Sequence, residues 1–118
     1  MAGARGEGFL DLDGEQYPVL FTLRALADAE RLTGKTVMQL MAEAQRSTMG
    51  VGDLAQLLAV GLEHARRDGR TRDRGYTLND AWHLLESLGF AAVAVVVFEA
   101  LAAVMAYSRP KGDADPPV

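Results

Sequence analysis

Apolar and polar residues alternate on both sides of an Asp13-Gly14 pair near the start of the chain. Apolar positions cluster over residues 9–12 and again over residues 17–21. An Asp-Gly pair tolerates the positive φ angles of a type I′ turn, whose twist matches that of two paired strands. The pattern therefore predicts a β-hairpin. Pro18 has no N–H to donate, so we expect its position to face a sheet edge or a bulge, and we expect the sheet to be small.

Helical periodicity follows the hairpin directly. Thr22 is placed to cap the start of a helix over residues 23–33, and Gly34 is placed to end it in the left-handed conformation. Glu30 falls on the side predicted to be buried, so we expect it to pair with Arg24, Arg31 or the next helix. The broad apolar arc of this helix contains Leu23, Ala25, Leu26, Ala27, Ala29 and Leu32.

Capping residues and apolar spacing predict four further helices. Thr36, with a glutamine three residues later, marks the start of the second helix. Asp53 marks the start of a third, which continues to a pair of arginines near residue 67. Thr77 with an aspartate three residues later opens a helix over residues 78–88, and a last helix is expected over residues 90–107.

The last predicted helix is apolar on all sides apart from Glu99. A carboxylate in the middle of a membrane span costs about 2.5 to 3.5 kcal/mol, so we do not expect this helix to cross a bilayer. Our interpretation is a central core helix. The alternative is a surface for a partner or for a second copy, because so small a chain covers the helix incompletely. The candidate partner-binding residues on it are Val97, Leu101, Val104 and Met105.

Composition limits the fold and the function. The 118 residues suffice for one domain, which we place at 1–109, followed by a polar, proline-bearing tail at 110–118 that is expected to be disordered. A net charge of -4 weighs against binding of nucleic acid by the whole surface. The absence of cysteine excludes disulfides and favours a cytoplasmic location. We expect an α+β fold, mostly α, with an N-terminal hairpin followed by about five short helices.

Several polar groups resemble fragments of catalytic or metal sites, but each lacks partners. His83 and Glu86 lie three residues apart on one helix, which alone does not make a metal site, and a solvated histidine is expected. His64 beside Glu63 lies near a helix end, where an imidazole can interact with the helix dipole. Residues 33–36 match only the end of a phosphate-binding loop. We therefore expect no enzyme, no catalytic residue, no metal and no cofactor.

A cluster of arginines interrupts the acidic chain. It can be a solvated loop whose first two members favour a helix C-terminus. It can also be an electrostatic handle for an acidic partner. Nucleic acid is a weaker interpretation, because no aromatic residues alternate with the arginines for base stacking and Tyr76 stands alone. The members of the cluster are Arg66, Arg67, Arg70, Arg72 and Arg74.

Two segments near the start carry a family resemblance. They read F-L-D-L-D-G-E-Q-Y and F-T-L-R-A-L-A-D-A-E-R-L-T-G-K. In these segments the chain resembles the tail assembly chaperones of long non-contractile tailed phages and the tail proteins of gene transfer agents. In that family a short hairpin leads into a helix of the type A-L-A-x-x-E-x-x-T-G, followed by further short helices.

The resemblance implies a protein that acts in the host cytoplasm during tail assembly. Such a chaperone binds the tape measure protein and helps bring tail tube proteins to it. We expect a homo-oligomer that binds neither nucleic acid nor a membrane. Two alternatives remain open at this point: a structural tail component of the same family, and a small DNA-contacting regulator that uses the loop from Arg66 to Arg74.

Overall fold

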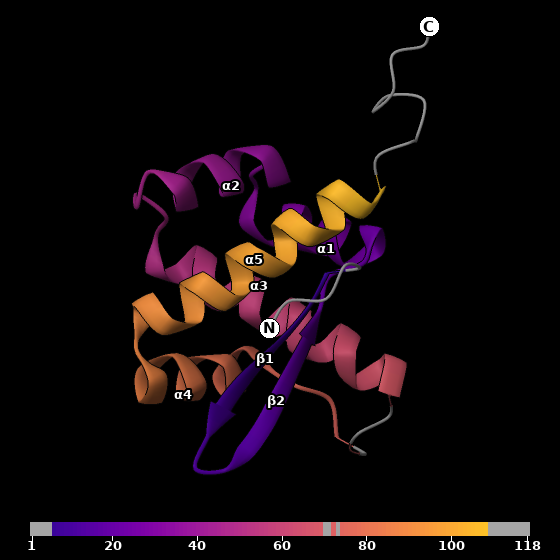
Figure 1. Ribbon diagram of the computed structural model, residues 1–118, viewed down its shortest axis with the longest axis vertical. Coiled ribbons are helices and arrows are strands. Elements are labelled where there is room, and N and C mark those ends of the chain that lie inside the picture. Colours follow the sequence, from indigo (N-terminus) through magenta and orange to yellow (C-terminus); the bar gives the residue numbers. More distant parts are fainter. Residues whose placement is uncertain (1–5, 70–71, 73, 109–118) are drawn as a thin grey trace, which may run out of the picture.

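Two strands and five helices follow one another in the computed structural model, which describes residues 6–69, 72 and 74–108. The predicted fold class, a hairpin followed by five helices in one compact unit, is confirmed (Figure 1). The predicted boundary at residue 109 and the tail at 110–118 lie outside the described residues. The elements are β1 (Glu7–Leu12), β2 (Glu15–Leu20), α1 (Leu23–Thr33), α2 (Val37–Gln45), α3 (Val51–Gly69), α4 (Leu78–Leu88) and α5 (Phe90–Ser108).

The hairpin has the turn that its sequence predicts. Asp13 and Gly14 have φ angles of 54° and 83°, the two positive values that a type I′ turn requires. Phe9 of β1 lies opposite Pro18 of β2. A hydrogen-bonded pair exchanges two N–H···O bonds, so Pro18 must occupy a non-hydrogen-bonded position with its nitrogen directed away from β1. Pro18 therefore lies at an outer edge, as expected.

Local signals set the ends of α1 and α4. The Thr22 hydroxyl accepts a hydrogen bond from the Ala25 N–H at 3.1 Å, and Gly34 ends α1 with a φ of 74°. Thr77 and Asp80 form a complete capping box at the start of α4. Each of these caps satisfies backbone groups that a helix end leaves free, which explains why the sequence alone located them.

Helix α3 starts three residues earlier than predicted. Asp53 was expected to cap this helix, but α3 begins at Val51, and the first helical bond runs from the Leu54 N–H to the Gly50 carbonyl at 3.1 Å. The Asp53 carboxylate instead accepts from Lys35 Nζ at 2.7 Å. The local pattern predicted that Asp53 caps α3, but its side chain forms a tertiary contact with Lys35 instead.

Two glycines let helices approach the hairpin closely. A Cβ at Gly61 of α3 would lie 2.7 Å from the ring of Phe21 and 3.0 Å from Val19. A Cβ at Gly8 of β1 would lie 3.0 Å from Val96 of α5. Helices α3 and α5 thus cover the inner face of the hairpin, while its turn projects beyond the helices (Figure 1).

All seven elements contribute to one hydrophobic core, but α1 contributes less than predicted. Ala25, Leu26 and Ala29 are buried, whereas Leu23 and Leu32 at the borders of the apolar arc are exposed. Helix α1 packs mainly against α3, so only a narrow face of it is covered. The largest fully buried side chains are Phe21, Leu40, Leu54, Leu57, Leu58, Leu62, Leu101, Val19, Val93 and Val97.

Candidate functional site

An apolar groove opens between the N-terminal half of α5 and the connection from α2 to α3. Its volume is about 370 Å³. Apart from one serine, every lining side chain is apolar, so the groove excludes ionic chemistry and suits the side chains of another protein. The lining residues are Ala44, Ser47, Met49, Leu54, Phe90, Ala91, Ala94, Val95, Val97, Phe98 and Leu101.

Two sharp changes of chain direction shape the groove. Gly89, with a φ of 95°, separates α4 from α5, and the two helices meet at a bend of 119°. Ser47 follows α2 with a φ of 58°, and the Thr48 N–H returns to the Glu43 carbonyl at 2.8 Å. The chain after α2 is therefore held against the side of α5 rather than continuing away from it.

Lys35 stabilises the connection from α2 to α3, which forms one wall of the groove. Its ammonium group lies 3.0 Å from the Glu43 carboxylate of α2 and 2.7 Å from the Asp53 carboxylate of α3. The two carboxylates raise the pKa of Lys35 above its ordinary value, chiefly through the hydrogen bond to Asp53. One cation thus ties the two helices that flank the connection over residues 46–50.

The groove has a buried floor and an exposed rim. Val97 and Leu101, two of the candidate partner-binding residues, are buried and form part of the floor together with Leu54. The rim contains Phe90 and Val95, which are 39% and 56% exposed. The burial of Val97 and Leu101 agrees with the interpretation of α5 as a core helix, and the exposed rim of the groove is formed by other residues of α5.

The other two candidates on α5 lie away from the groove. Val104 is buried, and its Cβ lies close to the backbone at Gly6, where the chain enters the hairpin. Met105 is half-buried and packs against the core. The prediction that Val104 belongs to an exposed partner surface is thus wrong, because the start of the hairpin covers it.

A signal for the true rim was present in the sequence. Glu99 is the one charged residue of α5, and the structure places it on the exposed side. Val95 and Ala91 precede it by four and eight residues, which are helical spacings that share a face. Because burying a charged side chain costs free energy, the position of Glu99 in the sequence indicates which side of α5 faces solvent.

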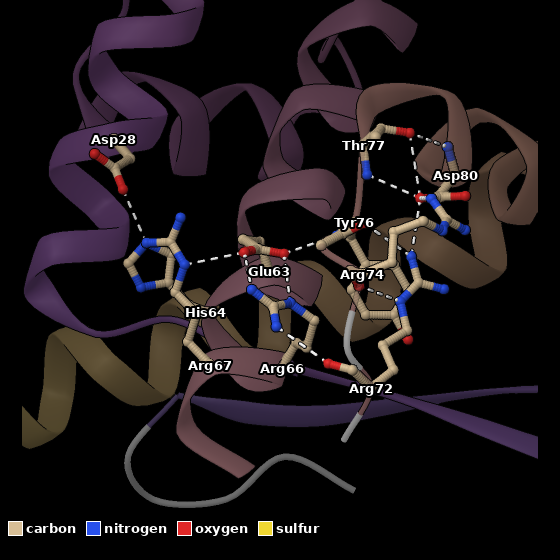
Figure 2. A network of polar contacts seen from close by, with 11 residues as sticks. Asp28, Glu63, His64, Arg66, Arg67, Arg72, Arg74, Tyr76, Thr77 and Asp80 are labelled. Carbon is tan, nitrogen blue, oxygen red and sulfur yellow. Dashed lines mark hydrogen bonds and ion pairs between the residues drawn. The ribbon is translucent and has the colours of Figure 1, made fainter. Parts of the chain in front are cut away.

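The four described arginines of the cluster share two carboxylates, so each is paired but the cluster keeps a net positive charge (Figure 2). Arg66 and Arg67 contact Glu63 at 2.6 Å and 2.9 Å. Arg72 and Arg74 contact Asp80 at 3.1 Å and 3.3 Å. Arg70 lies outside the described residues.

The four described arginines thus belong to ion pairs within the fold. Arg66 and Arg67 lie in the last turn of α3, as the first interpretation expected, and the side chains of Arg67 and Arg74 remain exposed to solvent.

Glu63 is the centre of this network. Besides the two arginines, its carboxylate accepts from the Tyr76 N–H at 2.7 Å. The hydrogen bond from Arg66 is the main cause that lowers the pKa of Glu63 to about 2, and Tyr76 and Arg67 add to it against the opposing effect of burial. The Arg72 guanidinium lies 3.7 Å from the centre of the Tyr76 ring. The cluster fastens the start of α4 to α3.

Helices α1 and α3 are joined by a second polar contact. His64 Nε2 lies 2.8 Å from Asp28 Oδ2, and this hydrogen bond is the main cause that lowers the pKa of Asp28 (Figure 2). The sequence pattern indicates a position near a helix end for His64, but it does not indicate the partner Asp28, which lies 36 residues away. Glu30 accepts from the Val37 N–H at 2.8 Å, so its predicted pairing with the next helix is confirmed.

Residues 6–69, 72 and 74–108 contain no group of three or more histidines, aspartates or glutamates arranged to hold a metal ion. No single described helix is long and apolar enough to span a membrane, and α4 and α5 meet that test only when taken together across their bend.

Comparisons of the chain with protein-family models, with curated protein sequences and with solved structures give no match.

Proposed function

We propose that this chain is a phage tail assembly chaperone that acts in the host cytoplasm and holds an apolar helical segment of the tape measure protein in the α2–α5 groove. The observation that carries the proposal is the groove itself, which is about 370 Å³ in volume and apolar in all but one lining residue. The resemblance of the hairpin and α1 to tail assembly chaperones supports the identity of the client. Recruitment of tail tube subunits is the second part of the same role.

The composition of the groove favours a helical client. Ala44, Ala91 and Ala94 are small, so they let the backbone of a docked helix approach, while Phe90 and Val95 at the rim can pack on its sides. Burying apolar surface contributes about 25 cal/mol per Å², which provides affinity without any catalytic group. Many copies along one elongated client would add avidity.

The two alternative functions gain no specific support. A structural tail component would need a larger sheet to build a tube wall, and the described residues contain a single two-stranded sheet. A DNA-contacting regulator would use the arginine cluster, but its described arginines contact Glu63 and Asp80 within the fold, and no aromatic residues alternate with them for base stacking. An interaction protein therefore remains the proposal.

Co-expression with the neighbouring tape measure gene, followed by capture on the tagged chain, tests the proposal. We expect salt-tolerant capture by the natural chain and a reduction of about tenfold or more for V95E, which places a charge on the groove rim. The matched control is L23E, because Leu23 of α1 is 62% exposed and lies outside the groove lining. Equal capture by V95E and the natural chain would remove the groove from the proposal, and no capture at all would refute the client.

A further inference from the structure

The outer edge of β1 has unpaired backbone groups. Because Phe9 lies opposite Pro18 in a non-hydrogen-bonded pair, the alternation of the ladder directs the N–H and C=O groups of Glu7, Phe9 and Asp11 away from β2. Among the described residues, none of these groups is hydrogen-bonded to another element. They form a row of donors and acceptors with the spacing that an added strand requires.

The outer edge of β2 is different. Pro18 lies in the middle of this edge, where it lacks the N–H that an incoming strand would bond. A proline on an edge strand is a common protection against strand addition. β1 contains no proline, so the hairpin has one blocked edge and one open edge.

The open edge also has a distinctive charge pattern. Glu7 and Asp11 are exposed and lie two residues on either side of Phe9, which is 45% exposed on the same outer face. The hairpin from residue 7 to residue 20 contains four carboxylates and no basic residue. An incoming strand would therefore meet an acidic edge with an aromatic ring at its centre.

We propose that the outer edge of β1 binds an extended segment of another protein in which basic residues stand two positions on either side of an apolar residue. The main-chain groups of Glu7, Phe9 and Asp11 bond the added strand. The two carboxylates pair with its basic residues, and Phe9 packs on its apolar residue. This surface is separate from the groove, so the inference does not rest on the proposed function.

A second copy of this chain fits the edge poorly. Antiparallel pairing of two β1 strands about Phe9 would place Glu7 opposite Asp11 twice, and directly opposed like charges destabilise a sheet. The chain also lacks a suitable segment of its own. Its three pairs of basic residues four positions apart enclose Thr33, Asp68 and Arg72, and none of these is apolar. The charge pattern thus points to a different protein.

An NMR titration with the isotope-labelled chain tests the proposal. The probe is the synthetic peptide Ser-Lys-Thr-Val-Thr-Lys-Ser, and its control carries glutamate in place of both lysines. We expect the amides of Glu7, Phe9 and Asp11 to shift and to gain protection from hydrogen exchange with the lysine peptide. The glutamate peptide should bind at least about tenfold more weakly, because its charges oppose the edge.

A matched pair of variants separates the main chain from the side chain. F9A and F9P both remove the aromatic ring, but only F9P also removes the outward N–H, and neither breaks a ladder bond. F9P should bind the lysine peptide at least about tenfold more weakly than F9A. Should F9P fail to fold, the double variant E7K/D11K provides the test, because it should prefer the glutamate peptide.

Three results would overturn the inference: equal binding by F9A and F9P, equal binding of the two peptides, or self-association of the natural chain that F9P abolishes. The groove variant V95E should bind the lysine peptide like the natural chain. Failure of the tape measure proposal would therefore leave this result unaffected.

Discussion

Individual carboxylates stabilise the connections that precede α2 and α4. Glu63, Asp80 and Glu30 accept from the backbone N–H groups of Tyr76, Thr77 and Val37 at 2.7 Å, 2.8 Å and 2.8 Å. These three N–H groups lie at or just before the starts of α4 and α2, where a helix leaves donors free. Bonds to an ionised acceptor are about twice as strong as neutral ones, so three side chains order two connections.

The substitution E63Q should destabilise the fold in a pH-dependent way. The carboxylate has a pKa of about 2 in the folded chain against 4.5 ordinarily, so its contribution is complete above pH 4.5 and is lost as the pH falls toward 2. One pKa unit corresponds to about 1.4 kcal/mol, which makes this contribution about 3 kcal/mol. Denaturant unfolding at pH 7 should show the loss, and at pH 2 the variant and the natural chain should converge.

The control for this measurement is E86Q, because Glu86 is an exposed glutamate of α4. It should change the free energy of unfolding by less than about 0.5 kcal/mol at either pH. The lowered pKa values of Asp28 and Asp80 add to the acid sensitivity of the natural chain and persist in E63Q. An E63Q variant as stable as E86Q at pH 7 would contradict the role of Glu63.

At the scale of elements, close approach of α3 to the hairpin depends on one residue without a side chain. Gly61 lies against Phe21 and Val19, both fully buried. Sequence patterns predicted α3 and the hairpin separately, because caps and turns are local. They did not predict this contact, since a glycine inside a helix has many explanations and its neighbours lie about forty residues earlier in the chain.

The substitution G61A should therefore destabilise the protein, whereas G52A should not. A methyl group at Gly61 would lie 2.7 Å from the Phe21 ring, and accommodating it should cost about 1 to 3 kcal/mol. Gly52 lies in the same helix with nothing within 4 Å of the added carbon, and alanine there should stabilise α3 by up to about 1 kcal/mol. Thermal unfolding of both variants provides the measurement, and equal effects would contradict the packing argument.

At the scale of the whole molecule, helix α5 has two structural roles, one on each of two faces. One face completes the core beneath the hairpin and α3, and the other forms a wall of the groove. The sequence predicted a central helix with more apolar surface than the fold hides, and it also predicted its ends. Apart from the single charge of Glu99, it gave no indication of which face is buried, because a helix that is apolar on all sides has almost no periodicity.

Truncation of one residue on each face of α5 should separate these roles. V93A shortens a fully buried side chain that lies outside the groove lining, so it should destabilise the fold by about 1 to 3 kcal/mol. V95A shortens an exposed side chain on the rim and should change stability by less than about 0.5 kcal/mol, while it weakens capture of a tape measure segment. Equal losses of stability would show that the rim is part of the core.

The sequence by itself determined the hairpin turn at Asp13-Gly14, the caps at Thr22 and Thr77, and the order of the elements. These features depend on residues within four positions of one another, so local physics suffices. Only the tertiary structure decided which side of α5 forms the groove, and which carboxylate His64 contacts. Those outcomes depend on contacts between distant segments, such as the 36 residues between Asp28 and His64, and a linear pattern does not encode that proximity.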